Sequence, residues 1–252
     1  NQEFNTIKTH QNQNNEIGTP LSLLRADSNT QMAILECGMR HKGDIKHLAK
    51  IIRPTHVVIT GIGYTHMENL KSLKSIASAK AELFLPAQKC EKQPRYAFIN
   101  ATTPHYEDVV KKAENVGYKI LPYGGSDKPE QNMNACYLIG RHFGLTNEQI
   151  QSGLSHYSSS DHRLKIIKTD TFTLVDDSYN SNPDGLQYAL QYIKRFSGRK
   201  IAVLGDMLEL GKMSEKSHKA IASWAIENQI DIIFTVGDQI SVLTSNKLPI
   251  FH

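Results

Sequence analysis

Short apolar runs alternate with amphipathic segments along most of this chain. The run QMAILECGM (31–39) predicts a buried strand that ends at an acidic residue. The segment DIKHLAKII (44–52) has apolar residues at helical spacing and stops before Pro54, and HVVITGIG (56–63) predicts a second buried strand. The pattern continues with a helix near 72–85, a strand at 95–101, a helix at 105–117, a strand at 118–124, and helices at 132–144 and 146–157.

A second series of strands and helices follows a stretch of small polar residues. The stretch SSSDHR (158–163) has the composition of an interdomain linker. Beyond it, strands are predicted at 171–177, 200–206 and 230–237, with helices beginning at Asp184 and Ser214. This alternation predicts an α/β fold with mostly parallel sheets. We place the two domains at 1–158 and 159–252.

Composition narrows the possible partners. The chain has 252 residues and a net charge of +4, without a basic run, so no nucleic-acid partner is expected. Three cysteines without CxxC spacing (Cys37, Cys90 and Cys136) argue against a disulfide framework and fit a cytoplasmic protein. No window approaches the roughly 20 apolar residues of a membrane span. The sequence does not indicate an oligomeric state.

Candidate chemistry lies where predicted strands end, because ligands of open α/β sheets bind outside the carboxyl ends of the strands. Glu36 ends one strand and is followed by Gly38, which permits close backbone approach, and His66 comes shortly after the next strand. A carboxylate and an imidazole there could hold Mg²⁺ or contact phosphate. The same spacing also fits a helix-capping Glu36 and an ordinary turn histidine.

Other polar residues allow two interpretations as well. Lys80 lies in an otherwise apolar helix face, where a lysine usually extends its amine to water but a desolvated amine can be reactive. Arg163 in the linker could reach a phosphate or be structural. The stretch LVDDSYNSNPDG (174–185) has more hydrogen-bonding groups than a helix cap requires.

In order, the segments NNEIGTPL, ILECGMRHKGDIKHLA, PTHVVITGIGYTHMENLKSLKSIASAKAEL, DHRL, VDDSYNSNPDG and IAVLGDMLELG resemble the Mur ligases. The resemblance runs from about Phe4 to Val236. The pair DDSYNSNPDG and LGDMLELG is specific to the branch that adds D-alanyl-D-alanine. The resemblance implies a central ATPase-type domain lacking its P-loop, followed by a truncated Rossmann-like C-terminal ligase domain.

The resemblance also implies an activity in peptidoglycan precursor synthesis. ATP would phosphorylate the carboxylate of UDP-N-acetylmuramoyl-tripeptide, and the amine of D-alanyl-D-alanine would attack the acyl phosphate. Both substrates are small molecules, and the implied cofactors are ATP and Mg²⁺.

Residue roles are carried over from the matching motifs. Glu36, His66 and Lys80 correspond to catalytic magnesium-site residues, and Lys80 resembles the lysine that family members carbamylate into an oxygen ligand. The resemblance implies ATP binding by Asn132, Arg163, Asp177 and Tyr179, and substrate binding by Asn12, Asn14, Asn15, Asn180 and Asn182.

Some positions depart from the family pattern. No GxxxxGKS or GxxxxGKT loop is present, and Gly61 stands where the family usually has Asn. Lys128-Pro129 replaces the His-Asn pair expected before Asn132. We therefore expect this chain to be a fragment of a longer ligase or a decayed relative, and not to turn over ATP by itself. Two alternatives stay open: a non-catalytic Mur-like module that binds a nucleotide or a partner, and a related ligase that uses another amine.

Overall fold

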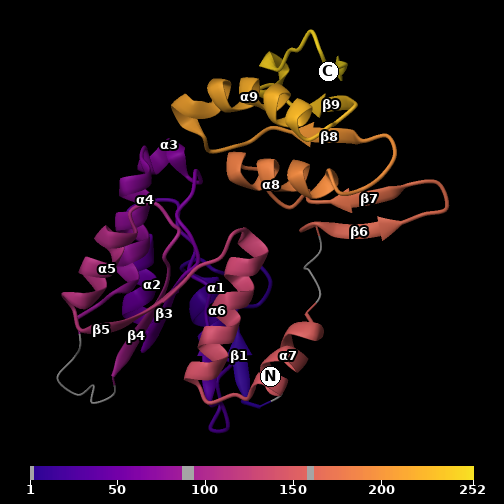
Figure 1. The fold of residues 1–252 in the computed structure, drawn as a ribbon. Helices are drawn as coiled ribbons and strands as arrows, with labels where there is room; N and C mark the ends of the chain where they lie inside the picture. Colours follow the sequence, from indigo (N-terminus) through magenta and orange to yellow (C-terminus); the bar gives the residue numbers. More distant parts are fainter. Residues whose placement is uncertain (1–2, 87–93, 158–161) are drawn as a thin grey trace. The chain divides into compact units, whose positions relative to one another are not determined.

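The computed structural model describes residues 3–86, 94–157 and 162–252, which form two compact units (Figure 1). The first unit contains the described residues up to Gly63 together with the described residues of Ser72–Tyr157. The second contains Tyr64–Lys71 together with the described residues of Ser158–His252. A short segment from the first half of the sequence therefore belongs to the second unit. The predicted boundary at 158/159 and most of the predicted linker lie outside the described residues.

A three-stranded parallel sheet in the order β3-β4-β5 forms the centre of the first unit. Ala97, Phe98 and Ile99 are consecutive and fully buried, so both faces of the central strand are covered. On one face, α6 packs through Ala135 against Phe98 and Tyr123. The elements are β3 (His56–Ile59), β4 (Arg95–Asn100), β5 (Tyr118–Tyr123), α2 (Asp44–Ile52), α4 (Leu73–Lys80), η1 (Ala81–Leu83), α5 (Tyr106–Glu114), α6 (Lys128–His142) and α7 (Asn147–Ser155).

The N-terminal part of this unit differs from the sequence prediction. It contains β1 (Thr6–Lys8), β2 (Met32–Ile34) and α1 (Gly18–Leu23), and β1 and β2 form a parallel pair. The buried strand predicted at 31–39 is wrong in extent and in burial, since β2 has three residues and the Ile34 side chain is 59% exposed. Among the described residues β2 pairs only with β1, and a two-stranded pair leaves much of its surface uncovered.

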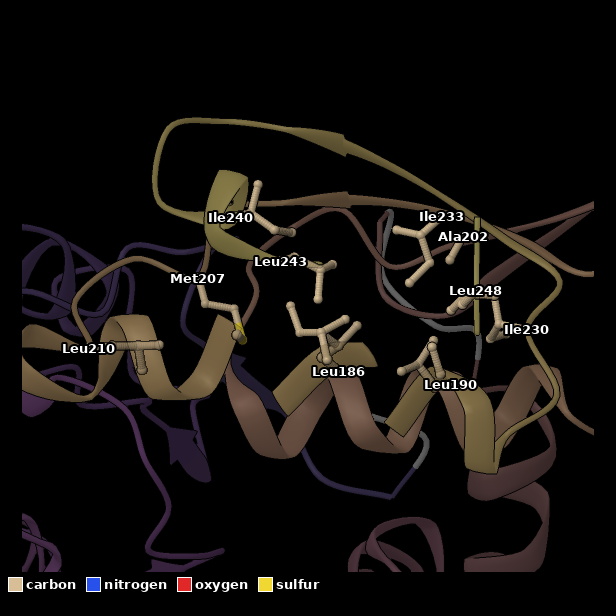
Figure 2. Close-up of a cluster of buried hydrophobic side chains, with 12 residues drawn as sticks. Leu186, Leu190, Ala202, Met207, Leu210, Ile230, Ile233, Ile240, Leu243 and Leu248 are labelled. Atoms are coloured by element: carbon tan, nitrogen blue, oxygen red, sulfur yellow. The ribbon is translucent and has the colours of Figure 1, made fainter. Parts of the chain in front are cut away.

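The second unit is built on a parallel sheet in the order β10-β9-β8. Ala202 and Ile233 of this sheet join Leu186 and Leu190 of α8 in a cluster of buried side chains (Figure 2). Each such leucine or isoleucine contributes roughly 1.5–3 kcal/mol to folding. The alternate residue Val203 is exposed. The elements are α3 (Met67–Leu70), β6 (Lys165–Lys168), β7 (Thr173–Asp176), α8 (Pro183–Ile193), β8 (Ile201–Gly205), η2 (Gly211–Met213), α9 (Ser214–Glu227), β9 (Ile232–Val236), η3 (Ile240–Val242) and β10 (Ile250–Phe251).

An antiparallel hairpin of β6 and β7 precedes this sheet. The strand β6 was not predicted from the sequence, because its residues Lys-Ile-Ile-Lys do not alternate between apolar and polar. The other sheets are parallel, so the predicted α/β class with mostly parallel sheets is confirmed. No helix in the described ranges has the length and apolar composition needed to cross a membrane.

Candidate functional site

Asn14 and Glu36 of the first unit contact each other. The Asn14 side-chain amide donates to Glu36 Oε1 at 3.0 Å, and the Gly38 N–H donates to the Asn14 carbonyl at 2.7 Å. A Cβ at Gly38 would lie 2.7 Å from Asn14 Oδ1, so glycine is what permits this close approach. Glu36 is exposed, and its described side-chain contact is with Asn14. The arrangement holds a carboxylate at the surface beside an amide.

Lys80 ends α4 with a half-buried side chain. Its Nζ donates to the carbonyl of Gly61 at 2.6 Å, so the amine contacts the backbone of the turn after β3. Burial lowers the pKa of Lys80, and the negative charge of Glu36 partly offsets this effect. A lowered pKa increases the fraction of neutral, nucleophilic amine. The first unit therefore brings Glu36 and Lys80 within electrostatic range of each other.

The other two asparagines of the N-terminal loop have different surroundings. Asn15 Oδ1 accepts hydrogen bonds from the N–H groups of Gly18 at 2.8 Å and Ile17 at 3.2 Å, which supports the start of α1. Asn12 is exposed, and its backbone carbonyl accepts from the Asn14 N–H at 2.8 Å. Of the three, Asn14 is the residue that contacts Glu36.

Asn132, the remaining predicted residue of the first unit, is exposed on α6. Its neighbour Asn134 donates from Nδ2 to the Gly124 carbonyl at 2.7 Å. Among the described residues, no hydrogen bond joins Asn132 to Glu36 or Lys80.

Three predicted ATP-binding positions lie together in the second unit. The Arg163 guanidinium carbon is 4.2 Å from the centroid of the Tyr179 ring, a cation–π distance. Asp177 Oδ1 accepts from the Leu164 N–H at 3.1 Å, and the Tyr179 N–H donates to the His162 carbonyl at 3.0 Å. The residues around Arg163 are thus tied to the turn that follows β7.

Asp176 strengthens this connection. Its Oδ2 is 2.7 Å from His162 Nδ1, and its Oδ1 accepts from the Ser178 hydroxyl at 2.7 Å. Hydrogen bonds from the Ser178 side chain and then its backbone N–H lower the pKa of Asp176, with smaller effects from His162. The Asp176 carboxylate therefore links His162, the residue before Arg163, to the turn after β7.

The remaining polar residues of this turn lead into α8. Asn182 Oδ1 accepts from the Gly185 N–H at 2.9 Å and caps the helix, with Pro183 in its first turn. Asn180 is exposed. The excess of polar groups in this stretch is thus explained only in part by the helix start, since Asp176, Asp177 and Tyr179 bind the preceding segment.

His66 belongs to the second unit, whereas Glu36 and Lys80 belong to the first. Its Nδ1 lies 2.6 Å from Glu209 Oε2. Among the residues that the structure describes, no three His, Cys, Asp or Glu side chains gather closely enough to hold a metal ion. The predicted set of Glu36, His66 and Lys80 therefore stays a prediction.

Family comparison agrees with the fold. Residues 1–167 match the Mur ligase middle domain, and residues 162–247 match the glutamate ligase domain of Mur ligases. The chain belongs to the Mur ligase family.

Curated Mur ligases match nearly the whole chain. It is 33% identical to UDP-N-acetylmuramoyl-tripeptide--D-alanyl-D-alanine ligase of Bacillus subtilis (strain 168) over 264 residues, which cover 93% of this chain and 57% of that relative. The enzyme of the same name from Escherichia coli (strain K12) is 28% identical, covering 93% of this chain and 59% of the relative. The chain thus spans less than two thirds of the length of these Mur ligases.

Solved Mur ligase structures share the fold. MurF from Acinetobacter baumannii has a TM-score of 0.90 at 24% identity, covering 99% of this chain and 62% of that one. MurF ligase from Thermotoga maritima in complex with ADP has a TM-score of 0.84 at 22% identity, covering all of this chain and 65% of that one. At these identities the likeness concerns the fold alone.

Two contact residues of this Mur ligase chain were not singled out from sequence. Glu209 lies within LGDMLELG, but its partner His66 is 143 positions away. Asp184, taken as a helix start, accepts from the Tyr64 N–H at 3.4 Å. Neither pairing has a local sequence signal, because both depend on how the chain folds back.

Proposed function

We propose that this Mur ligase chain is part of an ATP-dependent enzyme that joins D-alanyl-D-alanine to UDP-N-acetylmuramoyl-tripeptide in the cytoplasm. The observation that carries the proposal is the similarity of over nine tenths of the chain to curated ligases of that name. The grouping of the motif residues within each unit supports it.

Arg163, Asp177 and Tyr179 have the chemistry of a nucleotide site. A guanidinium binds phosphate oxygens, a carboxylate accepts hydrogen bonds from ribose hydroxyls, and an aromatic ring can pack against a base or sugar. The Asp176 contact with His162 links the residue before Arg163 to the turn that follows β7. The ADP bound to the Thermotoga maritima structure supports ATP as the nucleotide.

The donors of the first unit fit Mg²⁺, which prefers oxygen ligands. Glu36 offers an exposed carboxylate. Carbamylation of Lys80 would join carbon dioxide to its neutral amine with loss of a proton, which adds a carboxylate with two further oxygens. His66 would add a nitrogen donor. When bound, Mg²⁺ would neutralise phosphate charge as it develops during transfer.

The reaction places specific demands on the chain itself. The tripeptide carboxylate takes the terminal phosphoryl group of ATP and releases ADP, and the dipeptide amine then displaces phosphate to form an amide. The protein must hold two anionic reactants and exclude water. We assign Asn12, Asn14, Asn15, Asn180 and Asn182 to substrate contact. Asn14 would in addition orient Glu36.

The test uses the protein with all the sequence that its gene encodes. Phosphate release from ATP should require UDP-N-acetylmuramoyl-tripeptide and D-alanyl-D-alanine together, with each substrate alone as the control. Release with only another amine would contradict the amine assignment and identify a related ligase. Nucleotide binding without release under any of these conditions would instead identify a non-catalytic module.

A further inference from the structure

The segment Tyr64–Lys71 lies between β3 and α4 in the sequence but belongs to the second unit. The Tyr64 N–H donates to Asp184 Oδ2 at 3.4 Å, and the Glu68 N–H donates to the Glu209 carbonyl at 2.9 Å. Both contacts use backbone atoms of the segment. They hold it against the second unit without using the His66 ring.

The His66–Glu209 contact adds a side-chain interaction to this attachment. His66 Nδ1 lies 2.6 Å from Glu209 Oε2, and both side chains are partly exposed. An ionised carboxylate can only accept a hydrogen bond, so Nδ1 must carry the proton. In the neutral ring Nε2 is then unprotonated, with its lone pair directed away from Glu209.

The backbone at both residues is unusual. His66 has φ of 57° and Glu209 has φ of 62°, and neither is glycine. Such left-handed residues persist where the surroundings hold them, and they are concentrated at functional sites. Both partners of the His66–Glu209 contact therefore have an uncommon backbone conformation.

We propose that Glu209 is a positioning residue for His66. Its carboxylate selects the Nδ1–H tautomer and orients the ring so that Nε2 can face a bound cation. Carboxylates that accept the second N–H of a metal-binding histidine act in this way. The inference rests on the proposed function, because it takes His66 as a magnesium-site residue.

The first arm of the test measures the tautomer. The chain is labelled with ¹⁵N-histidine, and the His66 signals are assigned as those missing from His66→Gln. The wild type should show a protonated Nδ1 and an unprotonated Nε2 at about pH 8. Glu209→Ala should give the tautomer mixture of a free imidazole. In Glu209→Gln the amide oxygen can still accept a hydrogen bond, so the fraction of the Nδ1–H tautomer should lie between those of the wild type and Glu209→Ala. Circular dichroism checks that each variant is folded.

The control variant is Glu215→Gln. Glu215 is an exposed acid near the start of α9 that pairs with Lys219, so the same chemical change is made away from His66. It should leave the His66 signals unchanged. A His66 tautomer that is the same in Glu209→Ala as in the wild type would overturn the proposal.

The second arm measures cation binding, with Mn²⁺ alone as the probe and free Mn²⁺ counted by electron paramagnetic resonance. Loss of a metal ligand's hydrogen-bond partner weakens binding about 10–100-fold, and Glu209→Ala should show such a loss while Glu215→Gln does not. Equal affinity of Glu209→Ala and the wild type would overturn the positioning role. If the wild type does not bind Mn²⁺, His66 has no cation role, even where the tautomer measurements agree with the proposal. This result therefore distinguishes failure of the cation role of His66 from failure of the positioning role of Glu209.

Discussion

Lys80 differs from an ordinary surface lysine through its position. Its amine contacts the Gly61 carbonyl at 2.6 Å, and burial lowers its pKa. The sequence predicted both a lysine extended into water and a reactive one, because helical spacing alone cannot measure desolvation. The structure supports the desolvated amine.

Lys80 should form a carbamate with dissolved carbon dioxide. Only the neutral amine reacts with carbon dioxide, and the neutral fraction rises as the pH increases towards the pKa. Because the pKa of Lys80 is lowered, Lys80 should react at a lower pH than an ordinary lysine, whose pKa is about 10.4. In ¹³C-bicarbonate, a ¹³C NMR carbamate signal should appear in the wild type, grow as the pH is raised above neutral, and vanish in Lys80→Arg. Lys74→Arg, at an exposed lysine of α4 on the same unit, is the control. A signal that survives Lys80→Arg would refute this assignment.

Asp176 should lose part of its acidity when Ser178 is changed. The Ser178 hydrogen bonds lower the Asp176 pKa from 3.8, so the ionised network holds above that value and is lost as pH falls through the lowered pKa. Ser178→Ala should raise the pKa towards 3.8, as followed by ¹³C NMR of the carboxyl group. Ser223→Ala, on the exposed side of α9, should not change it. An unchanged Asp176 pKa in Ser178→Ala would show that the hydroxyl does not hold the carboxylate.

At the scale of elements, periodicity predicted helices better than strands. The helix predicted at 44–52 matches α2, and the helix predicted at 146–157 corresponds to α7, which begins with a Thr146–Gln149 capping box. Apolar runs predicted the positions of several strands, but not how much of each strand is buried by neighbouring elements. Val203 of β8 is 70% exposed because helices pack on the other face of its sheet, and β2 has a single described neighbour.

The attachment of α6 to the central sheet should depend on pH. His56 of β3 lies 3.1 Å from His142 of α6 between their Nε2 atoms, and it stacks on Tyr96. Burial, and then the charge of His142, lower the pKa of His56. The unfolded chain has the ordinary pKa of about 6.5, so stability is complete above that pH and falls as pH drops through the lowered folded value.

Urea unfolding followed by circular dichroism tests this dependence. The first unit should unfold at lower urea at about pH 5.5 than at about pH 7.5, and His142→Gln should reduce the difference without abolishing it, because burial of His56 remains. His47→Gln, at an exposed position of α2, should leave it unchanged. A midpoint independent of pH in the wild type would contradict the role of His56.

The loop after β9 should be sensitive to a single methyl group. Gly237 has φ of 128°, and a Cβ there would overlap the Asp206 carboxyl carbon. Asp206 accepts a hydrogen bond from the Ile240 N–H at 2.7 Å. We expect Gly237→Ala to lower the free energy of unfolding by about 1–3 kcal/mol through backbone strain. Displacement of the Asp206 carboxylate should lower it by roughly 1–3 kcal/mol more.

Gly198→Ala is the matched control, because Gly198 has φ of 84° but no atom within 4 Å of a new Cβ. Gly198→Ala should therefore lose stability through backbone strain alone, without the further loss that comes from displacing the Asp206 carboxylate. Trp224 is the single tryptophan and packs against the core of the second unit, so its fluorescence reports unfolding of that unit. Equal losses of stability in the two variants would show that Asp206 does not matter.

At the scale of the whole molecule, the order of motifs predicted the family. It did not predict that Tyr64–Lys71 joins the second unit, since that depends on contacts with Asp184 and Glu209, far along the chain. The sequence likewise placed Glu36, His66 and Lys80 in one set, whereas the structure divides them between units.

The central claim is that residues of both units serve one ligation reaction. The most direct test is the rate of phosphate release that depends on D-alanyl-D-alanine, measured on the complete gene product with Glu36→Gln in the first unit or Asp177→Asn in the second. Each variant should lose roughly 100-fold or more, whereas Glu114→Gln and Asp238→Asn should retain the wild-type rate. A wild-type rate in either Glu36→Gln or Asp177→Asn would contradict the claim.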